Sequence, residues 1–148
     1  MAEPSEQIGT TESSTNSTVA AGAQQKLSDC SRVLVFDSSG HVLHSTFVVR
    51  RDELPALASC VGDRDTAVRN GLVVEGQHFE VHRHHPPLVY GRGSLGLAPE
   101  FSEGAAVCAV DRGPAGLPVY AIVTYRMPHV SARVVPLLQE FCREYLQG

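Results

Sequence analysis

Between Arg32 and Tyr125 the chain repeats one pattern, in which short apolar runs are separated by turn-forming residues. Each run has the length of a strand, and the turns contain Asp, Asn, Gly or Pro, as in Asp37-Ser38-Ser39-Gly40. Such turns join neighbouring strands as hairpins, and successive hairpins build an antiparallel sheet. The pattern predicts six or seven antiparallel strands. The runs begin at Val33, Val42, Leu72, Phe79, Leu88, Ala105 and Val119.

After the last apolar run the periodicity becomes helical. Apolar residues spaced three and four apart form one face, made by Val134, Leu137, Leu138, Phe141, Cys142, Tyr145 and Leu146. Because proline is tolerated in a first helical turn, Pro136 predicts a helix start near Val135. A short middle helix is predicted from Asp52, a suitable N-cap, through Val61. One antiparallel sheet packed by terminal helices is an α+β fold.

The first 28 residues differ from the rest, because they are rich in Ser and Thr and contain no aromatic residue. Such a segment buries too little apolar surface to offset its ordering entropy, so residues 1–28 are predicted to be a disordered tail. The last part of the tail, Val19–Leu27, is rich in Ala and Gln and is able to form a short helix against the domain. The folded domain is expected to span residues 29–148.

Composition excludes several classes of protein. The 148 residues carry a formal charge of −4, which argues against electrostatically driven nucleic-acid binding. No stretch approaches the ~20 apolar residues that cross a bilayer, so no transmembrane segment is expected. The N-terminus lacks the basic start and apolar run of a signal peptide, so we expect a cytoplasmic protein. Its four scattered cysteines are expected to be reduced.

Several motifs, taken in order, resemble those of profilins. Val33–Leu43 is similar to the first profilin hairpin, and Asn70–Arg83, which reads N-G-L-V-V-E-G-Q-H-F-E-V-H-R, is the most specific match. Tyr125–Pro128 and Glu144–Leu146 resemble two C-terminal profilin motifs. The resemblance covers about residues 30–148. It implies the profilin fold and a role in regulating actin assembly in the cytoplasm, at the cytoskeleton.

The resemblance also implies binding surfaces for monomeric actin, proline-rich ligands and phosphoinositide lipids. The matching actin-binding positions are His78, Glu80, Val81, Arg83 and Arg92. The proline-rich site retains Leu43 and Tyr145 but has no tryptophan, so we expect weak or absent binding of proline-rich ligands. Phosphoinositide binding requires several arginines to converge on one surface, and the sequence does not place them together.

A metal site is one alternative interpretation of residues 78–85, which read H-F-E-V-H-R-H-H. As a regular strand this segment places four possible ligands on one face, namely His78, Glu80, His82 and His84, and Arg83 on the other. Same-face neighbours on one strand lie about 6–7 Å apart, too far for all four to surround one ion. An exposed polar face is therefore preferred, and no metal or other cofactor is expected.

A scaffold is the other alternative. The sequence contains no G-x-S-x-G elbow, no P-loop and no dinucleotide-binding fingerprint followed by a suitable acidic residue, so no enzyme is predicted. A fold does not by itself define a function. A profilin-like chain that binds phosphoinositides or partner proteins in traffic or GTPase complexes, without actin, is therefore the second hypothesis. Direct binding to actin distinguishes the two.

Overall fold

The computed structural model describes residues 3–93 and 102–147, with side chains from Thr15 onward. Its seven strands form one antiparallel sheet in the order β2-β1-β7-β6-β5-β4-β3. The strands are β1 (Arg32–Asp37), β2 (Val42–Ser45), β3 (Leu72–Val74), β4 (Gln77–His85), β5 (Leu88–Gly93), β6 (Glu103–Val110) and β7 (Val119–Arg126). The predicted α+β fold with a single antiparallel sheet is confirmed.

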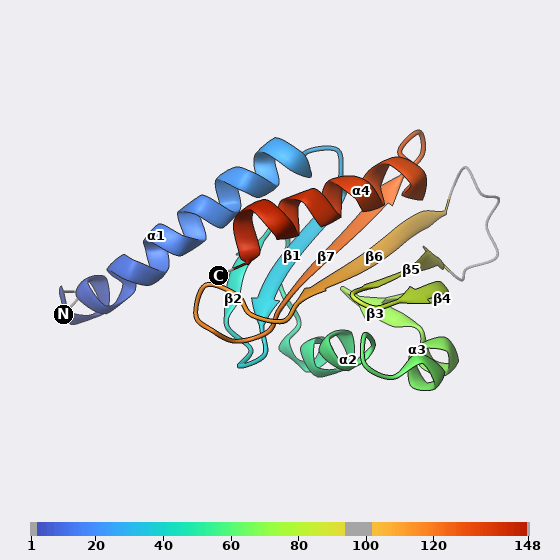
Figure 1. The fold of residues 1–148 in the computed structure, drawn as a ribbon, viewed down its shortest axis with the longest axis horizontal. Coiled ribbons are helices and arrows are strands. Elements are labelled where there is room, and N and C mark those ends of the chain that lie inside the picture. Colours follow the sequence, from blue (N-terminus) through green and yellow to red (C-terminus); the bar gives the residue numbers. More distant parts are fainter. Residues whose placement is uncertain (1–2, 94–101, 148) are drawn as a thin grey trace.

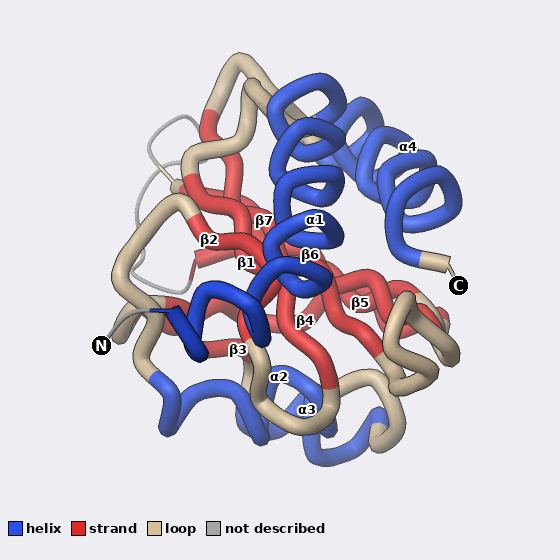
Figure 2. Tube along the Cα trace, turned by 90° about the vertical axis from the view of Figure 1, so that its left-hand side faces the viewer, coloured by secondary structure: helices blue, strands red, loops and turns tan. Residues whose placement is uncertain are grey.

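Helices cover both faces of this sheet (Figure 1). On one side, the α1/α4 face, lie α1 (Glu3–Lys26) and α4 (Ser131–Phe141), which continues into the π-helical segment η3 (Cys142–Leu146). The opposite side, the α2/α3 face, carries the 3-10 helix η1 (Arg51–Glu53), α2 (Leu54–Ser59) and α3 (Arg64–Asn70). Figure 2 shows the sheet between these two helical layers. No helix within the described ranges is both long and apolar enough to span a membrane.

Two hydrophobic cores separate the three layers. Alternate residues of the central strands enter different cores, so that Val33 and Val35 pack under α1 and α4, whereas Leu34 and Phe36 pack under α2 and α3. The central strands are buried on both faces, and this is why their sequences are continuous apolar runs. β4 is buried on one face only and shows the expected alternation, with Phe79 fully buried between exposed neighbours.

The N-terminal segment forms one helix in the structure, and its last part packs against the domain, as expected for a short helix of Val19–Leu27. α1 runs from Glu3 to Lys26, and the side chains of Val19, Ala23 and Leu27 are at most 3% exposed in the core below α4. These three residues are spaced four apart and therefore lie on one helix face.

We expect Leu27→Ala to lower the free energy of unfolding by about 2–5 kcal/mol, the usual cost of truncating a buried leucine. Leu27 is 2% exposed and belongs to the same core as α4. Gln24→Ala, at an exposed position of α1 close to Leu27, is the control and should change stability by less than about 0.5 kcal/mol. Urea denaturation measures both variants. Equal effects would mean that α1 is not part of the core.

Two helix starts also differ from the prediction. α4 begins at Ser131, so Pro136 lies inside the helix rather than in its first turn. Burial of Val134, Leu138 and Phe141 offsets the backbone hydrogen bond that the proline removes. In the middle of the chain Asp52 lies within η1 and does not cap α2.

The helix α3 was not predicted from the sequence. Asp63 caps its first turn, because the Asp63 carboxylate accepts a hydrogen bond from the Thr66 backbone N–H.

Candidate functional site

Two paired strands carry most of the residues predicted to contact a partner. Directly opposite residues of an antiparallel pair point to the same side of the sheet. Glu80 is opposite Arg92, and Arg83 is opposite Tyr90. Tyr90 packs against the core beneath α1 and α4, so all four residues lie on the α1/α4 face. We call Glu80, Arg83, Tyr90 and Arg92 the β4–β5 surface.

A β-bulge in β4 places Arg83 on this surface. The register of β4 with β5 shifts between Val81 and Arg83, which leaves His82 as an extra, exposed residue. A regular strand would have turned Arg83 to the opposite face, as the sequence analysis expected. The extra residue reverses the alternation, because side chains alternate faces with a period of two. Arg83 therefore joins Glu80 and Arg92, which corrects the prediction.

Gly91 permits the bulge. A Cβ atom added to Gly91 would lie 1.6 Å from the carbonyl oxygen of Glu80 and 3.0 Å from the Cα of Val81. β4 therefore approaches β5 more closely than any side chain would allow. A glycine inside a strand pattern is a known sign of a bulge or of a close backbone approach, and this signal was present in the sequence.

Val81, which the resemblance also places at the actin surface, does not lie on the β4–β5 surface. Its side chain is 9% exposed and belongs to the core under α2 and α3. Beyond the bulge, His84 points to the same side, where its Nε2 lies 2.8 Å from the carbonyl oxygen of Cys60 at the end of α2. His78 lies at the start of β4, with Nε2 2.8 Å from the carbonyl oxygen of Asn70.

The bulge also separates the possible metal ligands. His82 and Glu80 are neighbours, with 3.8 Å between Nε2 and Oε2, and both are exposed. His84 is on the opposite face of the sheet, so the four ligands of the metal hypothesis do not share one face. Within residues 3–93 and 102–147, no group of three or more His, Cys, Asp or Glu side chains is arranged to hold a metal ion.

Arg92 connects the β4–β5 surface to the start of α4. Its guanidinium lies close enough to Tyr125 to lower the pKa of that hydroxyl slightly, although burial dominates and raises the pKa overall. The Tyr125 hydroxyl is in turn 2.6 Å from the Ser131 hydroxyl at the first residue of α4. The ring of Tyr125 packs over Gly104, where an added Cβ would lie 2.3 Å from Cε2. The first turn of α4 is thus held beside Arg92.

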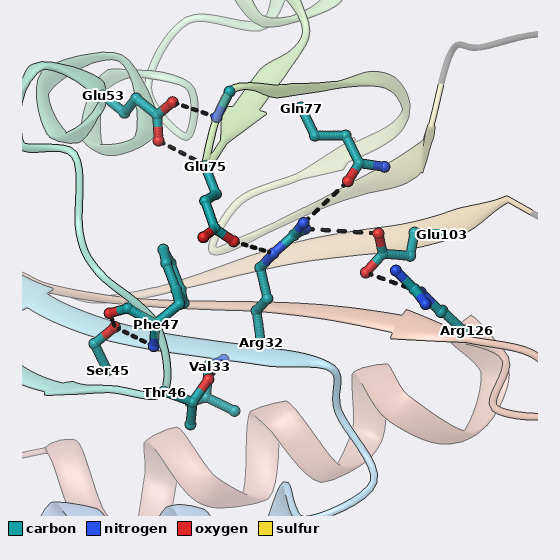
Figure 3. A network of polar contacts seen from close by, with 11 residues as sticks. Arg32, Val33, Ser45, Thr46, Phe47, Glu53, Glu75, Gln77, Glu103 and Arg126 are labelled. Atoms are coloured by element: carbon teal, nitrogen blue, oxygen red, sulfur yellow. Dashed lines mark hydrogen bonds and ion pairs between the residues drawn. The ribbon is translucent and has the colours of Figure 1, made fainter.

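A part-buried ionic network joins the β3–β4 hairpin to β1 and β6 (Figure 3). Arg32 of β1 donates from Nε to Glu75 Oε1 at 2.8 Å and from Nη2 to Gln77 Oε1 at 3.1 Å. Its Nη1 lies 3.6 Å from Glu103, which is 4% exposed and also 3.6 Å from the exposed Arg126. The sheet order separates β1 from β4 by three strands, so these contacts require a strongly curled sheet.

The two residues assigned to a proline-rich site do not form a shared aromatic groove. Leu43 is 7% exposed and lines a pocket that does not include Tyr145. The Tyr145 ring is stacked on Phe141 at 5.7 Å and packs against Gly22 of α1. Its hydroxyl donates to Gln25 Oε1 at 2.8 Å. These contacts hold Tyr145 against α1, so weak or absent binding of proline-rich ligands remains our prediction.

Sequence comparisons and structure comparisons give different results for this chain. No family model matches the sequence, and no curated protein sequence matches it. Solved structures do match. Profilin IA of Acanthamoeba castellanii superposes with a TM-score of 0.65 at 12% identity, over 82% of this chain and 90% of that one. For Schizosaccharomyces pombe profilin the values are 0.63, 16%, 80% and 86%. For LokiProfilin1 in complex with rabbit actin they are 0.64, 11%, 87% and 92%.

The protein is a small α+β module, in which paired terminal helices and short helices pack on opposite faces of one antiparallel sheet. Within that class its fold is the profilin fold. At 11–16% identity to these three structures, the similarity is one of fold. The fold expected from the motif order is therefore confirmed.

Proposed function

We propose that this chain binds monomeric actin through the β4–β5 surface and regulates actin assembly in the cytoplasm. One observation carries the proposal, namely the bulge that brings Arg83 to the side of the sheet on which Glu80 and Arg92 lie. The fold supports it, because matched structures include LokiProfilin1 and LokiProfilin2 in complexes with rabbit actin. On this proposal the chain acts as a binding protein and not as an enzyme.

The charges of the surface indicate what its partner presents. Arg83 is exposed and Arg92 half-buried, and the guanidinium of arginine forms bidentate contacts with carboxylates. Glu80 adds one negative charge beside them. An actin surface that fits would therefore place acidic groups over Arg83 and a donor near Glu80. Charges arranged in this way give orientation and specificity as well as affinity.

Charge reversal tests the proposal. We expect Arg83→Glu to weaken binding to monomeric actin about tenfold or more, because it places like charges in contact across the interface. Arg64→Glu is the matched control. Arg64 is exposed in the first turn of α3 on the opposite face, where a glutamate is compatible with the helix dipole. Titration calorimetry with monomeric actin measures both variants.

The outcomes separate the two functional hypotheses. Actin binding that Arg83→Glu abolishes and Arg64→Glu preserves supports the proposal. Equal effects of both reversals would contradict the assigned surface. If the unmodified protein does not bind actin at all, the actin-independent scaffold replaces the proposal, and phosphoinositide vesicles become the next ligand to test.

Without a working proline-rich site, we expect sequestration of actin monomers rather than delivery to proline-rich nucleators.

A further inference from the structure

A pocket lies at the end of the sheet where the β1–β2 turn and the β6–β7 connection meet α1. It has a volume of about 400 Å³, within the range of sites that bind small ligands or single side chains. α1 contributes Thr15 and Asn16, the β1–β2 turn contributes Asp37, and Leu43, Leu117 and Val119 form an apolar wall. None of the residues of the β4–β5 surface lines this pocket.

Asp37 is the charged group of this pocket, and only one of its carboxylate oxygens is engaged. Oδ1 accepts hydrogen bonds from the backbone N–H groups of Ser39 and His41, at 2.9 and 3.1 Å, and from the Ser39 hydroxyl at 2.5 Å. No donor among the described residues bonds to Oδ2. Asp37 is 5% exposed, yet no Lys or Arg of the described part of the chain lies within ion-pair distance of it.

Asp37 Oδ2 is not among the buried side-chain atoms without a partner in the described residues, so it is open to the pocket, where a cation would form a charge-assisted hydrogen bond with it. Asp37 presents one open oxygen, which suits the single point charge of an ammonium group better than the two-pronged guanidinium of arginine. The alkyl stem of lysine matches the apolar wall, because lysine packs its methylenes on apolar surfaces while its charged end finds a polar partner. Leu117, at the rim, is 37% exposed and offers a contact for a neighbouring apolar residue.

We propose that this pocket binds a lysine side chain of a partner protein, presented next to an apolar residue, with the ammonium at Asp37 Oδ2 and the stem against Leu43 and Val119. This site is separate from the actin surface. It also differs in chemistry from a proline-rich site, since a proline-rich ligand carries no charge for Asp37 to bind.

Short peptides test the pocket directly. The probe is the blocked tripeptide acetyl-Leu-Lys-Leu-amide, titrated into the full chain and followed by two-dimensional NMR. We expect shifts at Leu43, Leu117 and Val119. The analogue with norleucine in place of lysine keeps an alkyl stem but lacks the ammonium. It should bind about tenfold or more weakly, as expected for the loss of one charge-assisted hydrogen bond.

Matched variants locate the contact. Asp37→Asn retains a carbonyl oxygen for the turn and should weaken lysine-peptide binding about tenfold while leaving norleucine binding unchanged. Asp111→Asn, at an exposed aspartate of the β6–β7 connection that does not line the pocket, is the control and should have no effect. Leu117→Ala should weaken both peptides severalfold. It tests the apolar wall without altering the turn.

Each alternative result overturns the proposal. Equal binding of the lysine and norleucine peptides, or an unchanged affinity in Asp37→Asn, would mean that Asp37 does not recognise a cation. Cadaverine that binds as tightly as the peptide would identify a free amine, and not a protein segment, as the ligand. Octaproline that displaces the peptide and binds more tightly would assign the pocket to proline-rich ligands. Actin affinity should be the same in Asp37→Asn and the unmodified chain.

Discussion

Arg32→Ala is expected to lower the free energy of unfolding by about 3–5 kcal/mol, the usual effect of breaking a buried ion pair from one side. Its removal would leave the Glu103 carboxylate, 4% exposed, with Arg126 as its one cationic partner among the described residues, and that side chain is 68% exposed. Glu75 and Gln77 would lose their donor in the same step. The β3–β4 hairpin would then lose its attachment to β1. Urea denaturation measures the loss.

Two further variants identify its cause. Arg112→Ala removes an exposed arginine of the β6–β7 connection and should change stability by less than about 0.5 kcal/mol. The double substitution Arg32→Met with Glu103→Leu removes both charges together and should recover much of the loss, because no uncompensated charge is left buried. If the double variant is as unstable as Arg32→Ala, packing of the arginine stem, and not its charge, holds the hairpin.

Gly91→Ala is expected to destabilise the protein by about 2 kcal/mol or more and to weaken actin binding as well. The added methyl would lie 1.6 Å from the Glu80 carbonyl oxygen, a contact that only a backbone shift can relieve, and overpacking of this kind costs about 1–3 kcal/mol. That shift separates β4 from β5 at the bulge and moves Arg83 away from Arg92. Thermal unfolding and actin titration follow the two effects.

Gly93→Ala is the matched control on the same strand. The nearest atoms to an added Cβ at Gly93 are 3.6 Å away, an ordinary van der Waals contact. We therefore expect both stability and actin affinity to change little. A stable Gly91→Ala variant with normal actin affinity would contradict the role given to the bulge. A stable variant with reduced affinity would show that the bulge positions Arg83 without contributing to folding.

The β4–β5 surface shows how far local patterns lead to a site. The motif Asn70–Arg83 directed attention to β4, and Glu80, Arg83 and Arg92 lie on the same face of the sheet. The assumption of a regular strand failed at His82, because one extra residue reverses the direction of every side chain beyond it. This error also created the apparent cluster of four metal ligands. Gly91, on the neighbouring strand, was the only local sign of the irregularity.

Alternation and turn chemistry in the sequence predicted six or seven antiparallel strands and the C-terminal helix, because these are local properties of period two or 3.6. Tertiary structure decided the rest. It paired β1 with β7, placed Arg32 against Glu75 across a curled sheet, and packed Tyr145 against Gly22. Each of these contacts joins residues that no local pattern relates, since packing between distant elements is set by the shape of the whole fold.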